Sequence, residues 1–152
     1  MKYPKQFQKY ILEICEKLRW EFFVNEYQLT IAYSESRTLD GEEVAATINT
    51  DLRYLTCKIT IYPNLLDCWK KQDLKTINEC LVHEFAHIIT DPLYELAVKA
   101  VSKREEEFLD EVRERQTQRI TNILFPHLKK LLTINKPSNA RSNKSKRRRK
   151  RK

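Results

Sequence analysis

The segment ECLVHEFAHIITDPL, residues 79–93, places two histidines four positions apart, with a glutamate directly after the first. In an α-helix, positions four apart lie one above the other on the same face, so His83 and His87 can direct their imidazoles at one point. Two such imidazoles are typical Zn²⁺ ligands, and Glu84, displaced around the helix, can reach a metal-activated water without becoming a ligand. The segment therefore predicts a zinc site with Glu84 as general base.

The sequence on both sides of this segment predicts where its helix begins and ends. Asp73 is a suitable N-cap, and apolar residues follow it at helical positions: Leu74, Ile77, Leu81, Ala86 and Ile88. Because a proline cannot donate a backbone hydrogen bond and disfavours helical geometry in the residue before it, we expect the helix to end at Asp91 and Pro92.

A second, strongly charged helix is predicted after this one. Its pattern runs from about Leu93 to about Leu132, with a break near Ser102, and Pro126 is a candidate kink. The apolar face of this helix is predicted from four residues at helical spacing: Phe108, Val112, Ile120 and Ile123.

The N-terminal half predicts one helix and three strands. Residues 5–23 have apolar side chains at spacings of three and four, as in an amphipathic helix that lies across a sheet. The stretch YQLTIAYSES (27–36) is β-branched and aromatic, and EEVAATINTDLRYLTCKITIYPNLL (42–66) contains two further extended runs around a turn at 51–54. We therefore predict an α+β fold in which a mixed sheet of about three or four strands packs on this N-terminal helix and on the helix with the histidine motif. The long charged helix follows them.

Two connections in this half are also predicted. Asp40 and Gly41 mark the link between the first strand and the following pair, although too many residues intervene for a tight two-residue turn. Pro63 ends the last strand, and the residues from there through Trp69 are expected to form a short connecting segment.

The length and charge of the chain predict one domain and a tail. With 152 residues and 41% hydrophobic side chains, the chain can form one domain with a substantial core, which we place at 1–135. Residues 136–152 hold ten Lys or Arg and no acid, whereas residues 1–135 hold 19 basic and 21 acidic side chains. We expect the tail to be disordered, since it lacks apolar residues to bury.

The composition excludes several classes of protein. Gly41 is the only glycine, so neither a phosphate-binding glycine-rich loop nor a dinucleotide-binding motif can form. No stretch reaches the roughly 18 apolar residues of a membrane span, and residues 1–20 are unlike a signal peptide. The four cysteines form no C-x-x-C pair and are expected to be buried free thiols, as suits a reducing cytoplasm, including that of a phage host.

The motif helix resembles a known class of enzyme. VHEFAH (82–87) is similar to the active-site helix of zincin metallopeptidases. More closely, the chain from about Tyr27 to Leu124 resembles a group of small gluzincin-type metallopeptidases encoded by phages and prophages. Those proteins join an extended segment, here 46–66, to an H-E-x-x-H helix, a Pro-Leu pair and an acidic helix.

This resemblance implies a zincin-like fold and a peptide or protein substrate. In such a fold the strand TCKITIY (56–62) would lie at the sheet edge beside the active-site helix. An extended peptide could then add to that edge through backbone hydrogen bonds.

A catalytic zinc ion usually takes three protein ligands, so one more is needed. A third histidine soon after the helix is absent, and His127 is expected to be a surface or packing residue. A glutamate of the next helix suits the site better, and the candidates are Glu105, Glu106, Glu107, Glu111 and Glu114. The stretch ERQTQRITNIL (114–124) resembles a sequence pattern that follows the motif helix in the phage group. The glutamate of that pattern corresponds to Glu114, which is therefore the third ligand that the resemblance implies.

Several assignments stay open at this point. Glu111 is the alternative third ligand, Asp91 and Glu95 are less favoured, and Glu114 does not share the predicted apolar face of its helix. No oxyanion-stabilising residue is chosen among four possible donors: Tyr54, Tyr62, Tyr94 and Arg113.

Two functions are consistent with the sequence. The first is a zinc-dependent metallopeptidase that hydrolyses peptide bonds, and the second is a nucleic-acid-associated binding protein with a structural or vestigial zinc site. The tail at 136–152 can attract phosphate backbones without reading sequence, but it could instead be a localisation signal or have no specific partner.

Overall fold

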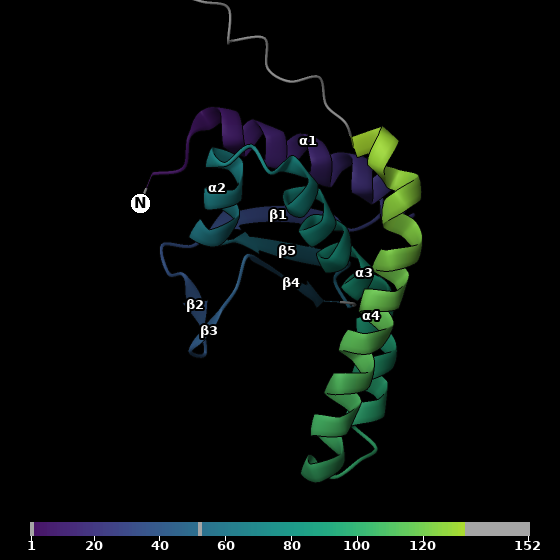
Figure 1. Cartoon of the computed structure of the whole chain (residues 1–152). Helices are drawn as coiled ribbons and strands as arrows, with labels where there is room; N and C mark the ends of the chain where they lie inside the picture. The colour runs from purple at the N-terminus through teal and green to yellow at the C-terminus, as the bar shows by residue number, and fades with distance from the viewer. Residues whose placement is uncertain (1, 52, 133–152) are drawn as a thin grey trace, which may run out of the picture.

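The computed structural model describes residues 2–51 and 53–132, and the predicted tail at 136–152 lies outside this part. The fold is α+β, as predicted: a three-stranded sheet packs against helices on one face, and a two-stranded hairpin lies beside it (Figure 1). The described part of the chain contains no helix that is long and apolar enough to cross a membrane.

Helix α1, Lys5–Glu21, confirms the first predicted helix. It lies over the sheet (Figure 1), and its apolar stripe supplies a large share of the core: Phe7, Tyr10, Ile11, Ile14, Cys15 and Leu18. Burial of this stripe, rather than intrinsic helix propensity, provides most of the free energy that stabilises a surface helix of this kind.

The main sheet contains the three predicted strands, β1 (Gln28–Tyr33), β4 (Ala46–Asp51) and β5 (Thr56–Ile61). Strand β5 lies in the centre, parallel to β1 and antiparallel to β4. Ile59 is fully buried against the helices, whereas the neighbouring Lys58 points to the opposite face and is exposed. The sheet therefore has one core face, as the alternation of side chains along a strand requires.

The strand beside the motif helix differs from the one implied by the resemblance. TCKITI is the central strand β5, and the edge strand that packs against helix α3 is β4. Strand β5 has fully buried isoleucines at positions 59 and 61, which favours a central position. Strand β4 is more polar, with Thr47, Asn49 and Thr50, and so tolerates an edge.

Asp40 and Gly41 lie in the predicted link between the first strand and the following pair, and they form a tight turn within it. They connect β2 (Thr38–Leu39) to β3 (Glu42–Glu43), two short antiparallel strands. Both turn residues have positive φ, 52° and 89°, as a two-residue type I′ hairpin requires. As predicted, the link between β1 and β4 (34–45) is too long for a two-residue turn, but the short β2–β3 hairpin inside it was not predicted.

Helix α2, Pro63–Lys70, replaces the predicted connecting segment. Pro63 occupies the first helical turn, where its missing N–H would have had no intrahelical partner. Leu65 and Leu66 are buried in the core, so this short helix is fixed by tertiary packing.

Helix α3, Leu74–Val98, carries the histidine motif and begins as predicted. The Asp73 carboxylate accepts hydrogen bonds from the Thr76 backbone N–H (3.1 Å) and hydroxyl (2.6 Å). The prediction that Pro92 ends the helix was wrong, because the helix continues six residues further, to Val98. Contacts with α4 hold this last part: the Arg113 guanidinium lies 4.5 Å from the centre of the Tyr94 ring.

Helix α4, Lys103–Leu132, is the second predicted helix, although its predicted first residues belong to α3. The break near Ser102 is confirmed, and Ser102 donates hydrogen bonds from its backbone N–H (2.9 Å) and hydroxyl (2.7 Å) to the Glu105 carboxylate. Pro126 lies inside α4. Helices α3 and α4 form an antiparallel pair that projects beyond the sheet (Figure 1).

The four cysteines are free thiols, of which Cys15 and Cys57 are buried and Cys68 and Cys80 are partly exposed. Burial raises the pKa of the Cys15 and Cys80 thiols. Both thiols are therefore poor nucleophiles, since the thiolate is the reactive form.

The position of Ile59 in the core predicts a large loss of stability on truncation. Ile59→Ala should lower the free energy of unfolding by about 3 kcal/mol, because it removes buried methyl groups and leaves a cavity. Lys58→Ala, on the exposed face of the same strand, should change it by less than about 0.5 kcal/mol. Urea denaturation followed by circular dichroism measures both, and equal effects would contradict the assigned sheet face.

Candidate metal centre

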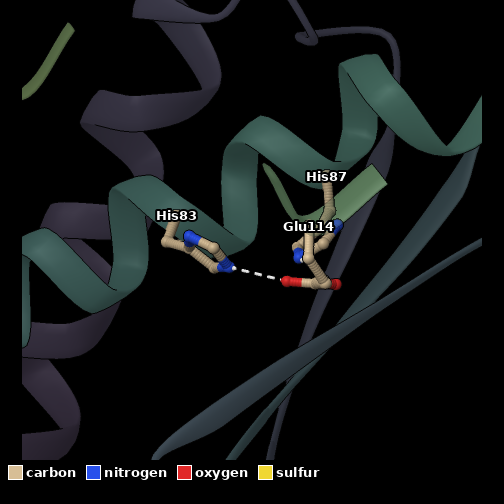
Figure 2. Close-up of side chains that lie close together, drawn as sticks. All are labelled: His83, His87 and Glu114. Atoms are coloured by element: carbon tan, nitrogen blue, oxygen red, sulfur yellow. Dashed lines mark ion pairs between the residues drawn. The ribbon is translucent and has the colours of Figure 1, made fainter. Parts of the chain in front are cut away.

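His83, His87 and Glu114 lie close together (Figure 2), where helix α3 packs against helix α4. The two histidines come from one face of α3, one turn apart, and the glutamate comes from α4. Glu114 Oε2 lies 3.4 Å from His83 Nε2, and Glu114 Oε1 lies 3.5 Å from His87 Nε2. The three potential ligand atoms all lie within 4.8 Å of one another, close enough to hold one metal ion.

These separations bring the three ligand groups near the spacing that one bound metal ion needs. Ligand atoms at 2.0–2.1 Å from a tetrahedral Zn²⁺ are about 3.3 Å from each other. The observed nitrogen–oxygen distances of 3.4 and 3.5 Å involve the two different oxygens of Glu114, and one ligand atom from each of the three residues lies within 4.8 Å of the other two. Two imidazoles and a carboxylate also form a donor set that suits divalent transition metals.

The other candidate ligands do not join this group. Glu111 lies one turn earlier on α4, and its carboxylate is 3.4 Å from the Arg115 guanidinium. Glu95 lines a separate cleft near the end of β4, and His127 is exposed on α4. The remaining candidates, Glu105, Glu106 and Glu107, lie in the exposed first turns of α4.

The face of α4 that packs on α3 differs from the predicted apolar face. Phe108 and Ile123 are 62% and 65% exposed, whereas Thr117 and Thr121 are buried. Thr117 follows Glu114 by three positions, so both side chains lie on the same side of the helix. Small buried threonines, which a search for apolar spacing overlooks, therefore direct Glu114 towards the histidines.

Polar groups behind His87 fix the orientation of its ring. His87 Nδ1 lies 3.3 Å from Asp91 Oδ1 and 3.4 Å from Thr117 Oγ1. The Thr117 hydroxyl is in turn 2.9 Å from the Thr90 hydroxyl. If the Nδ1 proton is donated to Asp91, Nε2 is left free to bind a metal. Carboxylates and hydroxyls commonly orient metal-binding histidines in this way.

Arg113 links the third ligand to the group behind His87. Its guanidinium lies 3.0 Å from Glu114 Oε1, 2.9 Å from Asp110 Oδ1 and 3.9 Å from Asp91 Oδ1. The same guanidinium packs over the Tyr94 ring. Arg113 therefore restricts the positions of the Glu114 and Asp91 carboxylates together.

The two glutamates of the site have opposite pKa shifts. The hydrogen bond to His83, supported by the charges of His87 and Arg113, lowers the pKa of Glu114 to about 2. Burial, with the nearby charge of Glu114, raises the pKa of Glu84 to about 8, against the opposing effect of a hydrogen bond from the Ile48 backbone. A divalent cation held by the three ligands would favour the ionised form of Glu84.

The ligand group opens into a cleft of about 700 Å³. Its walls are the β2–β3 hairpin, strand β4 and helices α3 and α4, and Glu84 lies in it beside both histidines. Of the four candidate oxyanion donors, only Arg113 lines this cleft. Tyr62 is buried in the fold, and Tyr54 is 76% exposed near the β4–β5 turn.

Comparison of the chain with known protein families, with curated proteins and with solved structures found no match.

Removal of any one ligand should abolish stable metal binding. The purified protein should carry about one zinc ion per chain, and His83→Ala, His87→Ala and Glu114→Ala should each lose most of it, because two protein ligands rarely hold zinc. Glu111→Ala, one turn away on α4, is the matched control and should retain the metal. Elemental analysis of the five preparations measures this, and equal zinc content in all of them would contradict the site.

The carboxylate behind His87 should affect affinity rather than stoichiometry. Asp91→Ala should weaken zinc binding by about 10- to 100-fold, because His87 loses the partner that fixes its ring and tautomer. Glu95→Ala, one turn further along α3, serves as the control. Competition with a chelator of known affinity measures the dissociation constants, and an unchanged value for Asp91→Ala would refute this orienting role.

Proposed function

We propose that the chain is a zinc-dependent metallopeptidase with a zincin-like, gluzincin-type active site. The observation that carries this proposal is that His83, His87 and Glu114 meet at one point of an open cleft that also contains Glu84. Zinc is proposed because two imidazoles with one carboxylate are a common ligand set of catalytic zinc, which leaves a further position for water.

Glu84 is the proposed general base. Its side chain is 8% exposed and lines the cleft next to the ligand histidines, but it does not belong to the ligand group. Zinc bound there would polarise the substrate carbonyl and make a water molecule more acidic. The Glu84 carboxylate would accept the proton of that water and pass it to the leaving amine.

The edge of β4 is the proposed binding surface for the substrate backbone. The Ala45 carbonyl accepts a hydrogen bond from the Tyr62 N–H, so odd-numbered residues of this strand pair with β5. The backbone groups of Ala46, Ile48 and Thr50 then point away from β5, and the Ile48 N–H hydrogen-bonds to the Glu84 side chain at the cleft. Apart from the Ile48 N–H, these outward groups are the ones with which an extended peptide can pair as a further strand.

A purely structural zinc site fits the geometry less well. Structural zinc is normally enclosed by four protein ligands, whereas this group contains three and lines a cleft of about 700 Å³. The competing role in nucleic-acid binding depends on the basic residues 136–152, which lie outside the described part of the chain.

The conservative substitution Glu84→Gln separates the two functions. If the native protein is a peptidase, the variant should keep its zinc, but its rate of peptide hydrolysis should fall by at least about 100-fold, because glutamine cannot accept the proton. A library of quenched fluorescent peptides measures hydrolysis, and elemental analysis measures zinc. A zinc-loaded native protein that cleaves no peptide, or a variant as active as the native protein, would contradict the proposal.

A further inference from the structure

We propose that the cleft selects peptides with a lysine or arginine side chain, bound at the end of β4 that adjoins the β2–β3 hairpin. This inference deepens the proposed peptidase function and rests on it for the statement that the bound peptide is a substrate. It is carried by the charges of the cleft wall, by the position of β4 at the edge of the sheet and by the way the hairpin is held.

The cleft wall carries far more negative than positive charge. Among residues 2–51 and 53–132, five carboxylates besides Glu84 line it, against one cationic side chain, that of Arg113. The five are Asp40, Glu42, Asp91, Asp110 and Glu114. A divalent metal ion would therefore still leave the cleft with a net negative charge, and a low-dielectric cleft of one sign concentrates ligands of the opposite sign.

Two of these carboxylates have no partner of their own. Asp91, Asp110 and Glu114 all lie within 4 Å of the Arg113 guanidinium. Within residues 2–51 and 53–132, by contrast, the side chains of Asp40 and Glu42 form neither an ion pair nor a hydrogen bond. They are thus available to a cation on a bound peptide.

The β2–β3 hairpin that presents Asp40 and Glu42 is anchored to the fold. The Asn64 side-chain amide, on α2, donates hydrogen bonds to the Arg37 carbonyl (3.0 Å) and the Val44 carbonyl (2.8 Å) on either side of the hairpin. The Arg37 guanidinium also lies 2.8 Å from the Asp67 carboxylate of α2. Anchoring keeps both acids at the cleft, which reduces the entropy lost on binding.

The charge is localised at one end of β4. The hairpin precedes Ala46, so its acids adjoin the first residues of the strand. The separate cleft at the other end contains two acids and two bases, Asp51, Glu95, Arg53 and Lys99, together with Pro92 and Leu96. A peptide extended along β4 would therefore meet unpaired acids at one end and a charge-balanced, partly apolar surface at the other.

The charge of the whole chain does not explain such a preference. The formal net charge is +8, so long-range attraction by the whole protein would favour acidic peptides. Attraction of a basic peptide must then come from local contacts in the cleft. It should weaken as salt is added, because exposed charges are screened.

Binding is tested with the full chain carrying Glu84→Gln, so that no probe is hydrolysed. The probes are two fluorescein-labelled peptides of one length, one with lysines and the other with serines in the same positions. Asp40→Asn with Glu42→Gln removes both unpaired acids, and asparagine tolerates the positive φ at position 40. Glu21→Gln with Glu26→Gln is the matched control, since both glutamates are exposed and neither lines the cleft. Glu21 is the last residue of α1, and Glu26 lies between α1 and β1.

Fluorescence anisotropy should show tighter binding of the lysine peptide than of the serine peptide. The two substitutions at Asp40 and Glu42 should weaken binding of the lysine peptide about fivefold, the size expected for two exposed ion pairs. They should leave the affinity for the serine peptide unchanged. The Glu21/Glu26 pair should change neither affinity. Equal binding of both peptides, no binding of either, or equal effects of the two pairs would overturn the inference.

The same probes distinguish a failure of this inference from a failure of the proposed function. If the native zinc-loaded protein cleaves both peptides with equal kcat/KM, the peptidase function stands and the cationic preference is wrong. If the lysine peptide binds as expected but the native protein does not cleave it, the preference stands and the peptidase function is wrong.

Discussion

The antiparallel packing of α3 on α4 is the constraint on which the candidate site depends. One face of α3 presents two imidazoles, but the carboxylate that completes the group comes from a residue 27 positions after His87. Thr90 and Thr117 hydrogen-bond across this contact, and Arg113 pairs with Asp91 and Glu114. The interactions that join the helices are therefore the same ones that orient the ligands, so stability and metal binding are coupled.

Local sequence signals predicted the elements that are determined by local interactions. The N-cap Asp73, the apolar stripe from Phe7 to Leu18 and the β-branched strands each leave a pattern that follows from helix or strand geometry. The four-residue spacing of His83 and His87 likewise places both on one face of a helix. These features needed no information about which segments meet in space.

The errors arose where tertiary contacts override a local preference. Pro92 should end a helix, but the packing of Tyr94 against Arg113 favours continuation to Val98. The position of β5 depends on its parallel partner β1, which no short pattern reveals. Glu114 was selected by resemblance and not by periodicity, because the face it shares is marked by threonines rather than by large apolar residues.

We expect one metal ion to bind where His83, His87 and Glu114 meet. Crystals of the zinc-loaded protein, measured on both sides of the zinc absorption edge, would locate the ion directly by its anomalous scattering. Zinc bound by these residues should give one strong peak about 2.0–2.2 Å from both Nε2 atoms and from a Glu114 oxygen. A peak held by other side chains, or none between the two helices, would contradict it.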